Sequence, residues 1–377
     1  MTIKYLRKKI DLHILYEFTV MKKPTPSLFG INRSNRNFSD PYYWGKNQFN
    51  SSFPVALACY MRSKNVPLIY ICHGSSGQSV LKTLDTAELF GTSEKSEDIF
   101  FSFETRFDAF RDFVHDELPA IDLVIGINDP IKQLRPIEIK LTTLPDNTTE
   151  NLSEDKYGSE LVIRSATMRY MALSMSRAVN AHQKEIRAIF EPVFATVRNW
   201  DNKAEMLAIS RPAVEALELF LNNFQHLESP LLMQPIWKTV GKSPILADHC
   251  LDIFVWSDFS LAHLFLTSAK SPRDRNTIPR QLRTALRLCR FLYEKSKSEK
   301  VFQAPIYDGM TFDNQNDKEF AVSGTKTHEI MACERLTKPA IHKDEIKNII
   351  MGGGQKFLSP ERRFDAILYF STELFGH

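Results

Sequence analysis

Two carboxylates and a lysine are spaced as a hydrolytic metal site would require. Glu138 and Lys140 are two residues apart in the apolar run 136–141, and Asp122 lies in the apolar run 121–126. Alternation in a strand places Glu138 and Lys140 on one face. A carboxylate such as Asp122 is costly to bury unless it is paired or binds metal. Together these residues suggest a divalent-metal hydrolytic site.

The elements that must position these side chains are two strands joined by a turn. Asn128, Asp129 and Pro130 are turn-forming residues between the two runs, so a hairpin is predicted. A charged pair such as Glu138 and Lys140 is also common on the solvated face of a half-buried strand. The spacing alone leaves both interpretations open.

The composition is that of an ordinary globular protein. The chain has 377 residues, of which 43% are hydrophobic and 25% charged, with a net charge of only +3. Any basic surface must therefore be local. The five scattered cysteines lack Cys-x-x-Cys spacing, so we expect neither disulfides nor structural zinc, and a reducing, bacterial cytoplasm. No apolar run approaches the ~20 residues of a membrane span, and a signal peptide is not expected. Met21 is an alternative start to Met1.

The pattern predicts an α/β (α+β mixed) fold. We expect strands over 66–72 and 251–259 and helices over 54–63, 97–118, 160–191 and 212–224, several of them bounded by prolines. In the helix 97–118, Phe103, Phe107, Phe110 and Val114 would form a buried stripe. Glu104 would lie beside that stripe, either as a surface carboxylate or as a further acidic residue reaching the metal site.

The segment 271–300 is the one clearly basic stretch, with nine Lys and Arg residues against three acids. On a helix, Arg280, Arg283, Arg287 and Arg290 fall on one face. Such a face either binds an anionic partner or is simply solvated.

The segment 24–54 combines aromatic residues with amides, arginines and serines, and has little periodicity. Its aromatic content favours an ordered loop. Its polar residues are types that reach phosphates and base edges, although amides also satisfy local backbone groups. The candidate nucleic-acid contacts are Asn32, Arg33, Asn35, Arg36, Lys46, Asn47, Gln48 and Asn50.

Three motifs together carry a resemblance to a known family. They are Asn-Arg-Ser-Asn-Arg-Asn-Phe-Ser at 32–39, Trp-Gly-Lys-Asn-Gln-Phe-Asn-Ser-Ser-Phe-Pro at 44–54, and Glu-Ile-Lys-Leu-Thr-x-x-Pro-Asp at 138–146. With Asp122, the chain resembles the HindVP-type type II restriction endonucleases of the PD-(D/E)XK superfamily. The likeness is strongest from 26 to 146, and Ile121 replaces the proline that often precedes the aspartate.

The resemblance implies a Mg²⁺-dependent enzyme that cuts double-stranded DNA at a short palindrome, G-R-C-G-Y-C in that family, leaving 5′-phosphates. It implies a central mixed sheet flanked by helices. Asp122, Glu138 and Lys140 would be catalytic, with Asp122, Glu138 and the Ile139 carbonyl as metal ligands. A homodimer is expected, with a cytosine-C5 methyltransferase as genetic partner.

The same sequence leaves two alternatives: a structure-dependent repair or recombination nuclease, and a non-catalytic DNA-binding protein that uses the face from Arg280 to Arg290, with Arg283 and Arg287 between them. The expected organisation is an N-terminal extension (1–23), a DNA-contacting region with the catalytic core (24–150), a largely helical region (151–270), and a basic helix with the C-terminal region (271–377). The last is expected to belong to the same globular unit.

Overall fold

One mixed sheet joins most strands of the molecule. The computed structural model describes residues 46–349, apart from 74–78, 95–97, 146–159, 241–244, 270–275, 324–338 and 347. Nine described strands form the sheet in the order β2-β1-β9-β8-β5-β4-β3, with β6 paired to β8 and β11 to β9. They are β1 (Leu68–His73), β2 (Ser79–Leu84), β3 (Ile99–Thr105), β4 (Ile121–Asn128), β5 (Ile131–Ile139), β6 (Thr142–Pro145), β8 (Pro230–Val240), β9 (Ile245–Ser257) and β11 (Ile341–His342).

The sheet combines local hairpins with long-range pairings. Strands β3, β4 and β5 are antiparallel neighbours, and β5 then pairs in parallel with β8, which comes from a distant part of the sequence. Strand β9 is antiparallel to β8 and parallel to β1. A further short sheet pairs β7 (Glu160–Arg164) with β10 (Lys318–Ser323). This mixed sheet with its flanking helices confirms the predicted fold class.

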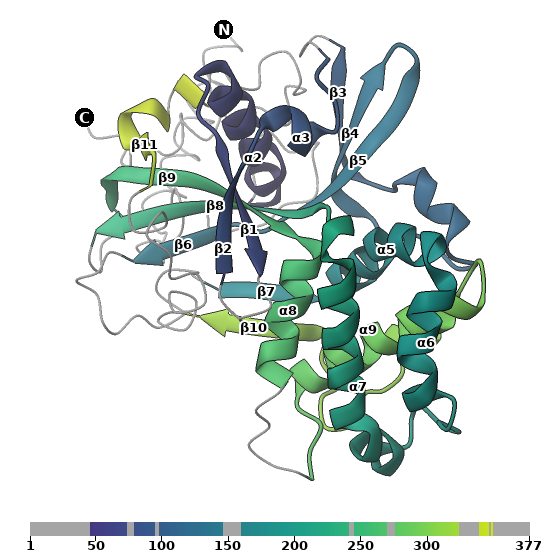
Figure 1. The fold of residues 1–377 in the computed structure, drawn as a ribbon. Coiled ribbons are helices and arrows are strands. Elements are labelled where there is room, and N and C mark those ends of the chain that lie inside the picture. Colours follow the sequence, from purple (N-terminus) through teal and green to yellow (C-terminus); the bar gives the residue numbers. More distant parts are fainter. Residues whose placement is uncertain are drawn as a thin grey trace, which may run out of the picture.

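Helices cover the sheet from different sides (Figure 1). The two faces of β4 show the division: Leu123 and Ile125 belong to the buried cluster that includes α2, whereas Val124, on the opposite face, belongs to the cluster of the larger helical layer. The helices are α2 (Lys46–Ser63), α3 (Thr86–Phe90), α5 (Ser165–Ala181), α6 (Gln183–Phe194), α7 (Lys203–Phe224), α8 (Asp258–Ala269), α9 (Arg280–Lys297) and α10 (Ala304–Tyr307), with short 3-10 turns at Asp108–Asp112, Gln225–Leu227 and Lys343–Glu345.

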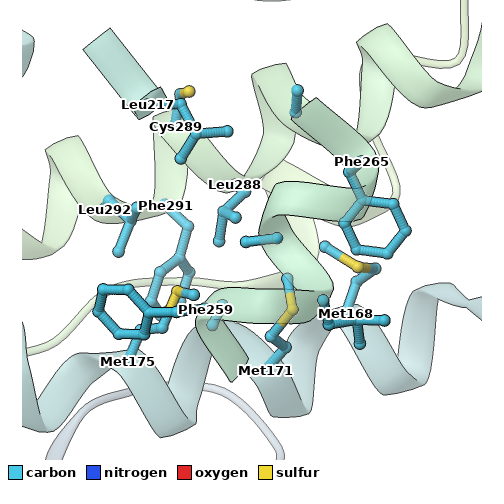
Figure 2. Packing of buried hydrophobic residues seen from close by; sticks show 14 of the residues in the cluster. Met168, Met171, Met175, Leu217, Phe259, Phe265, Leu288, Cys289, Phe291 and Leu292 are labelled. Carbon is cyan, nitrogen blue, oxygen red and sulfur yellow. The ribbon is translucent and has the colours of Figure 1, made fainter. Parts of the chain in front are cut away.

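The core of the helical layer is closely packed. Figure 2 shows methionines of α5 facing aromatic and aliphatic side chains of α7, α8 and α9. Met168, Met171, Phe265 and Phe291 are fully buried there. Burying each such side chain contributes about 1.5–3 kcal/mol relative to exposure. This layer forms the support on which α5 rests against the sheet.

Several predicted elements differ from the structure. The predicted helix 97–118 is wrong: β3 and a 3-10 turn (Asp108–Asp112) occupy it. The predicted helix 160–191 begins instead as β7 and breaks at His182 between α5 and α6. Prolines taken as boundaries, Pro54, Pro192 and Pro212, lie inside α2, α6 and α7. The strands near 66–72 and 251–259 and the hairpin are confirmed.

The expected domain boundaries near 23, 150 and 270 fall outside the described residues. Strands β8 and β9, from the range 151–270, lie in the same sheet as β4 and β5. Cys59, Cys72, Cys250 and Cys289 are free thiols. In the part of the chain that is described, no helix is both long and apolar enough to cross a membrane.

Asp258 ties the helical layer to the sheet through a buried carboxylate. It accepts hydrogen bonds from the Ser174 hydroxyl of α5 (3.0 Å), from the Ser229 amide (3.1 Å) and hydroxyl (3.2 Å), and from the Phe259 amide (2.9 Å). Burial raises the pKa of Asp258 to about 6, although these hydrogen bonds lower it in part. The folded protein therefore binds this proton more tightly than the unfolded chain.

This proton should make stability depend on pH. The contribution is fully present below pH 4, where the unfolded carboxyl is also protonated, and is lost as pH rises through about 6. Asp258→Asn cannot ionise, so its stability relative to wild type should improve by about 2–3 kcal/mol between pH 4 and pH 7. Unfolding midpoints of both proteins across this range measure the change. A constant difference between them would contradict the prediction.

Candidate active site

The β4–β5 hairpin brings the three predicted side chains together. Leu123 pairs with Ile137 across the hairpin, so one step further Asp122 stands opposite Glu138 on the same face. Lys140 follows the end of β5, where its amide donates to the Met233 carbonyl of β8 (2.9 Å). The parallel neighbour β8 therefore fixes the backbone that carries the lysine.

Lys140 bridges the two carboxylates. Its Nζ lies 2.6 Å from Glu138 Oε1, 3.4 Å from Asp122 Oδ2 and 3.3 Å from the Ile139 carbonyl oxygen. The Ile139 amide donates to Asp122 Oδ2 at 2.8 Å. Glu138 is buried, whereas the Asp122 side chain keeps 36% of its exposure and Lys140 23%. The site is thus closed on the Glu138 side and open on the Asp122 side.

The charges of the site perturb one another. Burial, reinforced by the neighbouring Glu138 charge, raises the pKa of Asp122 to about 6. Burial alone would lower the pKa of Lys140, but the attraction of Glu138 and Asp122 outweighs it and the pKa of Lys140 is raised. Lys140 is therefore a firmly held cation. Perturbed carboxylates of this kind cluster at functional sites.

The donor set fits a hard divalent cation. One positively charged atom already lies between both carboxylates, and no described donor bonds the remaining oxygens, Asp122 Oδ1 and Glu138 Oε2. Among the described residues, no three or more His, Cys, Asp or Glu side chains are grouped so that they could hold a metal ion by themselves. Mg²⁺ commonly takes only one or two protein carboxylates and completes its shell with water and phosphate. The residues present therefore suit Mg²⁺.

Two hydroxyl groups of α5 contact the residues of the site, and no sequence motif predicted them. Thr167 Oγ1 donates to Glu138 Oε1 at 2.8 Å, and the Tyr170 hydroxyl donates to the Pro136 carbonyl of β5. Both side chains are buried. They lie 29 and 34 residues from their partners in sequence, so no local motif could reveal the contacts.

Glu104 lies on β3 and not on a helix. The pairs Phe103–Leu123 and Thr105–Ile121 bracket it, so its place in the register is opposite Asp122. Its φ of +48° lies in the left-handed region, which is unusual for a residue with a side chain. Its side chain is exposed. Backbone strain of this kind concentrates at functional sites, so Glu104 stays a candidate for the acidic group beside Asp122.

Replacing this residue should separate stability from activity. Glu104→Gly removes the left-handed strain, which costs on the order of 1 kcal/mol, so the unfolding midpoint should hold or rise. If the carboxylate assists the site, DNA cleavage should fall at the same time. Thermal unfolding and initial cleavage rates test both halves. Full cleavage activity in this variant would show that Glu104 has no role in the site.

The predicted nucleic-acid contacts of the N-terminal segment are only partly covered by the structure. Asn32, Arg33, Asn35 and Arg36 lie outside the described residues. Lys46, Asn47, Gln48 and Asn50 lie on α2, which begins at Lys46 and not near Pro54, and their side chains are outside the description. These contacts therefore stay predictions.

The predicted arginine face of α9 is not a surface. Arg283 is 1% exposed and Arg287 3%. Both are paired with buried Glu319, and both donate to backbone carbonyls, such as Lys318 for Arg283 and Gly309 for Arg287. Both guanidinium groups are buried and share one carboxylate inside the fold, so we do not retain them as DNA contacts. Arg280 is half-buried at the start of α9, and Arg290 pairs with Glu294.

The sheet and the Asp122, Glu138 and Lys140 cluster are consistent with the core of a PD-(D/E)XK nuclease. The family model described as HindVP restriction endonuclease matches residues 44–375. The chain belongs to the HindVP restriction endonuclease family, and it is accordingly a restriction endonuclease.

Two relatives extend this assignment. "Type II restriction enzyme HgiDI" of Herpetosiphon aurantiacus is 38% identical over 351 residues, covering 93% of this chain and 97% of that protein. "Probable type II restriction enzyme HindVP" of Haemophilus influenzae is 39% identical over 350 residues, covering 93% and 95%. No solved structure matches the chain.

Proposed function

We propose that this restriction endonuclease is a type II enzyme that uses Mg²⁺ to hydrolyse double-stranded DNA at a short palindrome. The observation that carries the proposal is the contact of Lys140 with both Glu138 and Asp122 on the β4–β5 hairpin. The target G-R-C-G-Y-C, where R is a purine and Y a pyrimidine, is our starting hypothesis from the family resemblance.

The residues of the hairpin have distinct roles in this proposal. Asp122, Glu138 and the Ile139 carbonyl would hold Mg²⁺. When bound, the ion would polarise the scissile phosphate and lower the pKa of the attacking water. The Lys140 ammonium, which pairs with both carboxylates in the free protein, would offset negative charge that develops on the phosphate and hold the attacking water. Attack in line with the leaving 3′-oxygen yields a 3′-hydroxyl and a 5′-phosphate.

We further propose a C₂-symmetric homodimer. A palindrome presents two equivalent half-sites, and one active site per strand is the simplest way to cut both. The host must protect the same sequence in its own DNA from cleavage. A cytosine-C5 methyltransferase encoded nearby is therefore the expected genetic partner.

Cleavage of unmethylated phage DNA tests the proposal. With Mg²⁺ we expect discrete fragments that EDTA prevents and that DNA ligase rejoins, because ligase needs a 5′-phosphate and a 3′-hydroxyl. Run-off sequencing of the ends gives the site and the cut position, and Glu138→Gln is the inactive control. Smeared or structure-dependent products would favour a repair nuclease. Salt-sensitive binding without cleavage under Mg²⁺ or Mn²⁺ would favour a non-catalytic DNA-binding protein.

A further inference from the structure

The first turn of α5 touches the side chain that we assign to the metal. Thr167 Oγ1 lies 2.8 Å from Glu138 Oε1, and both residues are buried, with 2% and 7% exposure. A threonine in a helix often returns its hydroxyl to a carbonyl one turn earlier. Thr167 instead directs it across to the sheet.

This contact divides the Glu138 carboxylate into two unlike oxygens. Oε1 accepts from Thr167 and from Lys140, whereas Oε2 accepts from no residue that the structure describes. With Oε1 anchored, rotation of the carboxylate would break two hydrogen bonds. The arrangement keeps Oε2 available to bind a ligand that is not part of the protein chain.

We propose that Thr167 is a positioning residue that orients Glu138 for metal binding. The inference rests on the proposed function, because it takes Glu138 as a ligand of the ion. Outer partners of this kind fix the geometry of ligating side chains, and their loss typically weakens metal binding 10–100-fold.

Tyr170 supports the same strand one turn further along α5. Its hydroxyl contacts the carbonyl oxygens of Pro136 on β5 and Leu231 on β8 (3.2 Å for the latter). Thr167 and Tyr170 are three residues apart, hence on one face of the helix. The same face therefore fixes the backbone just before Glu138 and the side chain of Glu138 itself.

The start of α5 is also held by hydrogen bonds to residues 317 and 319. The Ser165 hydroxyl donates to buried Glu319 at 2.8 Å, and the Ser165 amide donates to the Asp317 carbonyl at 3.0 Å. Thr167 is two residues beyond these contacts, so little freedom is left for its hydroxyl. A side chain held in this way is preorganised before the ion arrives.

Hydroxyl deletion on α5 provides a matched pair of variants. Thr167→Val keeps the shape and removes the donor, and Thr167→Ser keeps the donor. Ser176→Ala removes another buried hydroxyl of the same helix, whose partner among the described residues is the Ala172 carbonyl (3.0 Å). The readout is Mn²⁺ affinity from the electron paramagnetic resonance signal of free Mn²⁺, which needs no turnover.

We expect Thr167→Val to weaken Mn²⁺ binding about 10–100-fold, and Thr167→Ser and Ser176→Ala to stay near wild type. Thr167→Ala is the second hydroxyl-free variant if the valine protein does not fold. Wild-type affinity in a folded hydroxyl-free variant would overturn the inference and leave the proposed function intact. Absence of Mn²⁺ binding by wild type, or binding that Glu138→Gln does not weaken, would overturn the proposed function and the inference with it.

Discussion

Lys140→Ala is expected to lower the rate of DNA cleavage by about 10²–10³-fold, the usual loss when one group that stabilises transition-state charge is removed. The side chain is the cation that touches both carboxylates, at 2.6 Å and 3.4 Å. Alanine leaves Asp122 and Glu138 in place, so DNA binding supported by Ca²⁺ should persist. Single-turnover cleavage and filter binding measure the two effects.

Lys184→Ala is the matched control for this substitution, because Lys184 is an exposed lysine of α6, outside the β4–β5 hairpin. It should cleave at the wild-type rate. Cleavage by Lys140→Ala within about fivefold of wild type would be far below the loss expected for a charge-stabilising group and would contradict the assigned role.

The metal dependence should separate Lys140 from Thr167. A variant that has lost orientation of a metal ligand regains activity as Mg²⁺ is raised, because saturation restores the loaded enzyme. A variant that has lost charge stabilisation in the transition state does not. Thr167→Val should therefore recover at high Mg²⁺, and Lys140→Ala should remain slow at any concentration.

The sequence predicted the hairpin well because its signals are local. Two apolar runs, a turn between them and alternation around Glu138 predicted both strands and their common turn, although β5 begins at Ile131, well before the predicted run 136–141. Residues brought together by one hairpin need no knowledge of the rest of the fold. The contact of Thr167 with Glu138 depends instead on how α5 packs on the sheet, which no spacing encodes.

The wrong helix 97–118 shows how two periodicities can overlap. Ile99, Phe101 and Phe103 alternate as in a strand, whereas Phe103, Phe107 and Phe110 recur as in a helix. Pairing of β3 with β4 along the hairpin decides between them. The tertiary partner, and not the local pattern, therefore determines this segment and places Glu104 in the register opposite Asp122.

The prediction that the arginines of α9 form an exposed face was wrong, because the sequence does not show which charged side chains are buried. Arg283 and Arg287 look unpaired on the helix, since their partner Glu319 is more than 30 residues away. Helix α9 is enclosed by α5, α6, α7, α8 and β10. Its polar face is turned toward β10 and the loop before it. Arg283 and Arg287 therefore form buried ion pairs inside the fold and do not lie on its surface.

Glu319→Ala is expected to lower the free energy of unfolding by about 3–5 kcal/mol, because it leaves two buried guanidinium groups without their carboxylate. Glu319 is fully buried and accepts from Arg287, from the Thr284 hydroxyl at 2.8 Å and from the Ser165 hydroxyl at 2.8 Å. Thermal or denaturant unfolding measures the loss.

Asp317→Ala is the matched control, two residues away. Asp317 pairs with Arg164, but both side chains are more than half exposed, so its loss should cost less than about 1 kcal/mol. Similar losses for the two variants would mean that the buried network contributes no more than a surface pair. If instead Glu319→Ala is destabilised as expected, the surviving folded fraction should also bind Mn²⁺ more weakly, because Ser165 anchors the turn that carries Thr167. A destabilised variant with unchanged Mn²⁺ affinity would show that the network supports the fold without orienting Glu138.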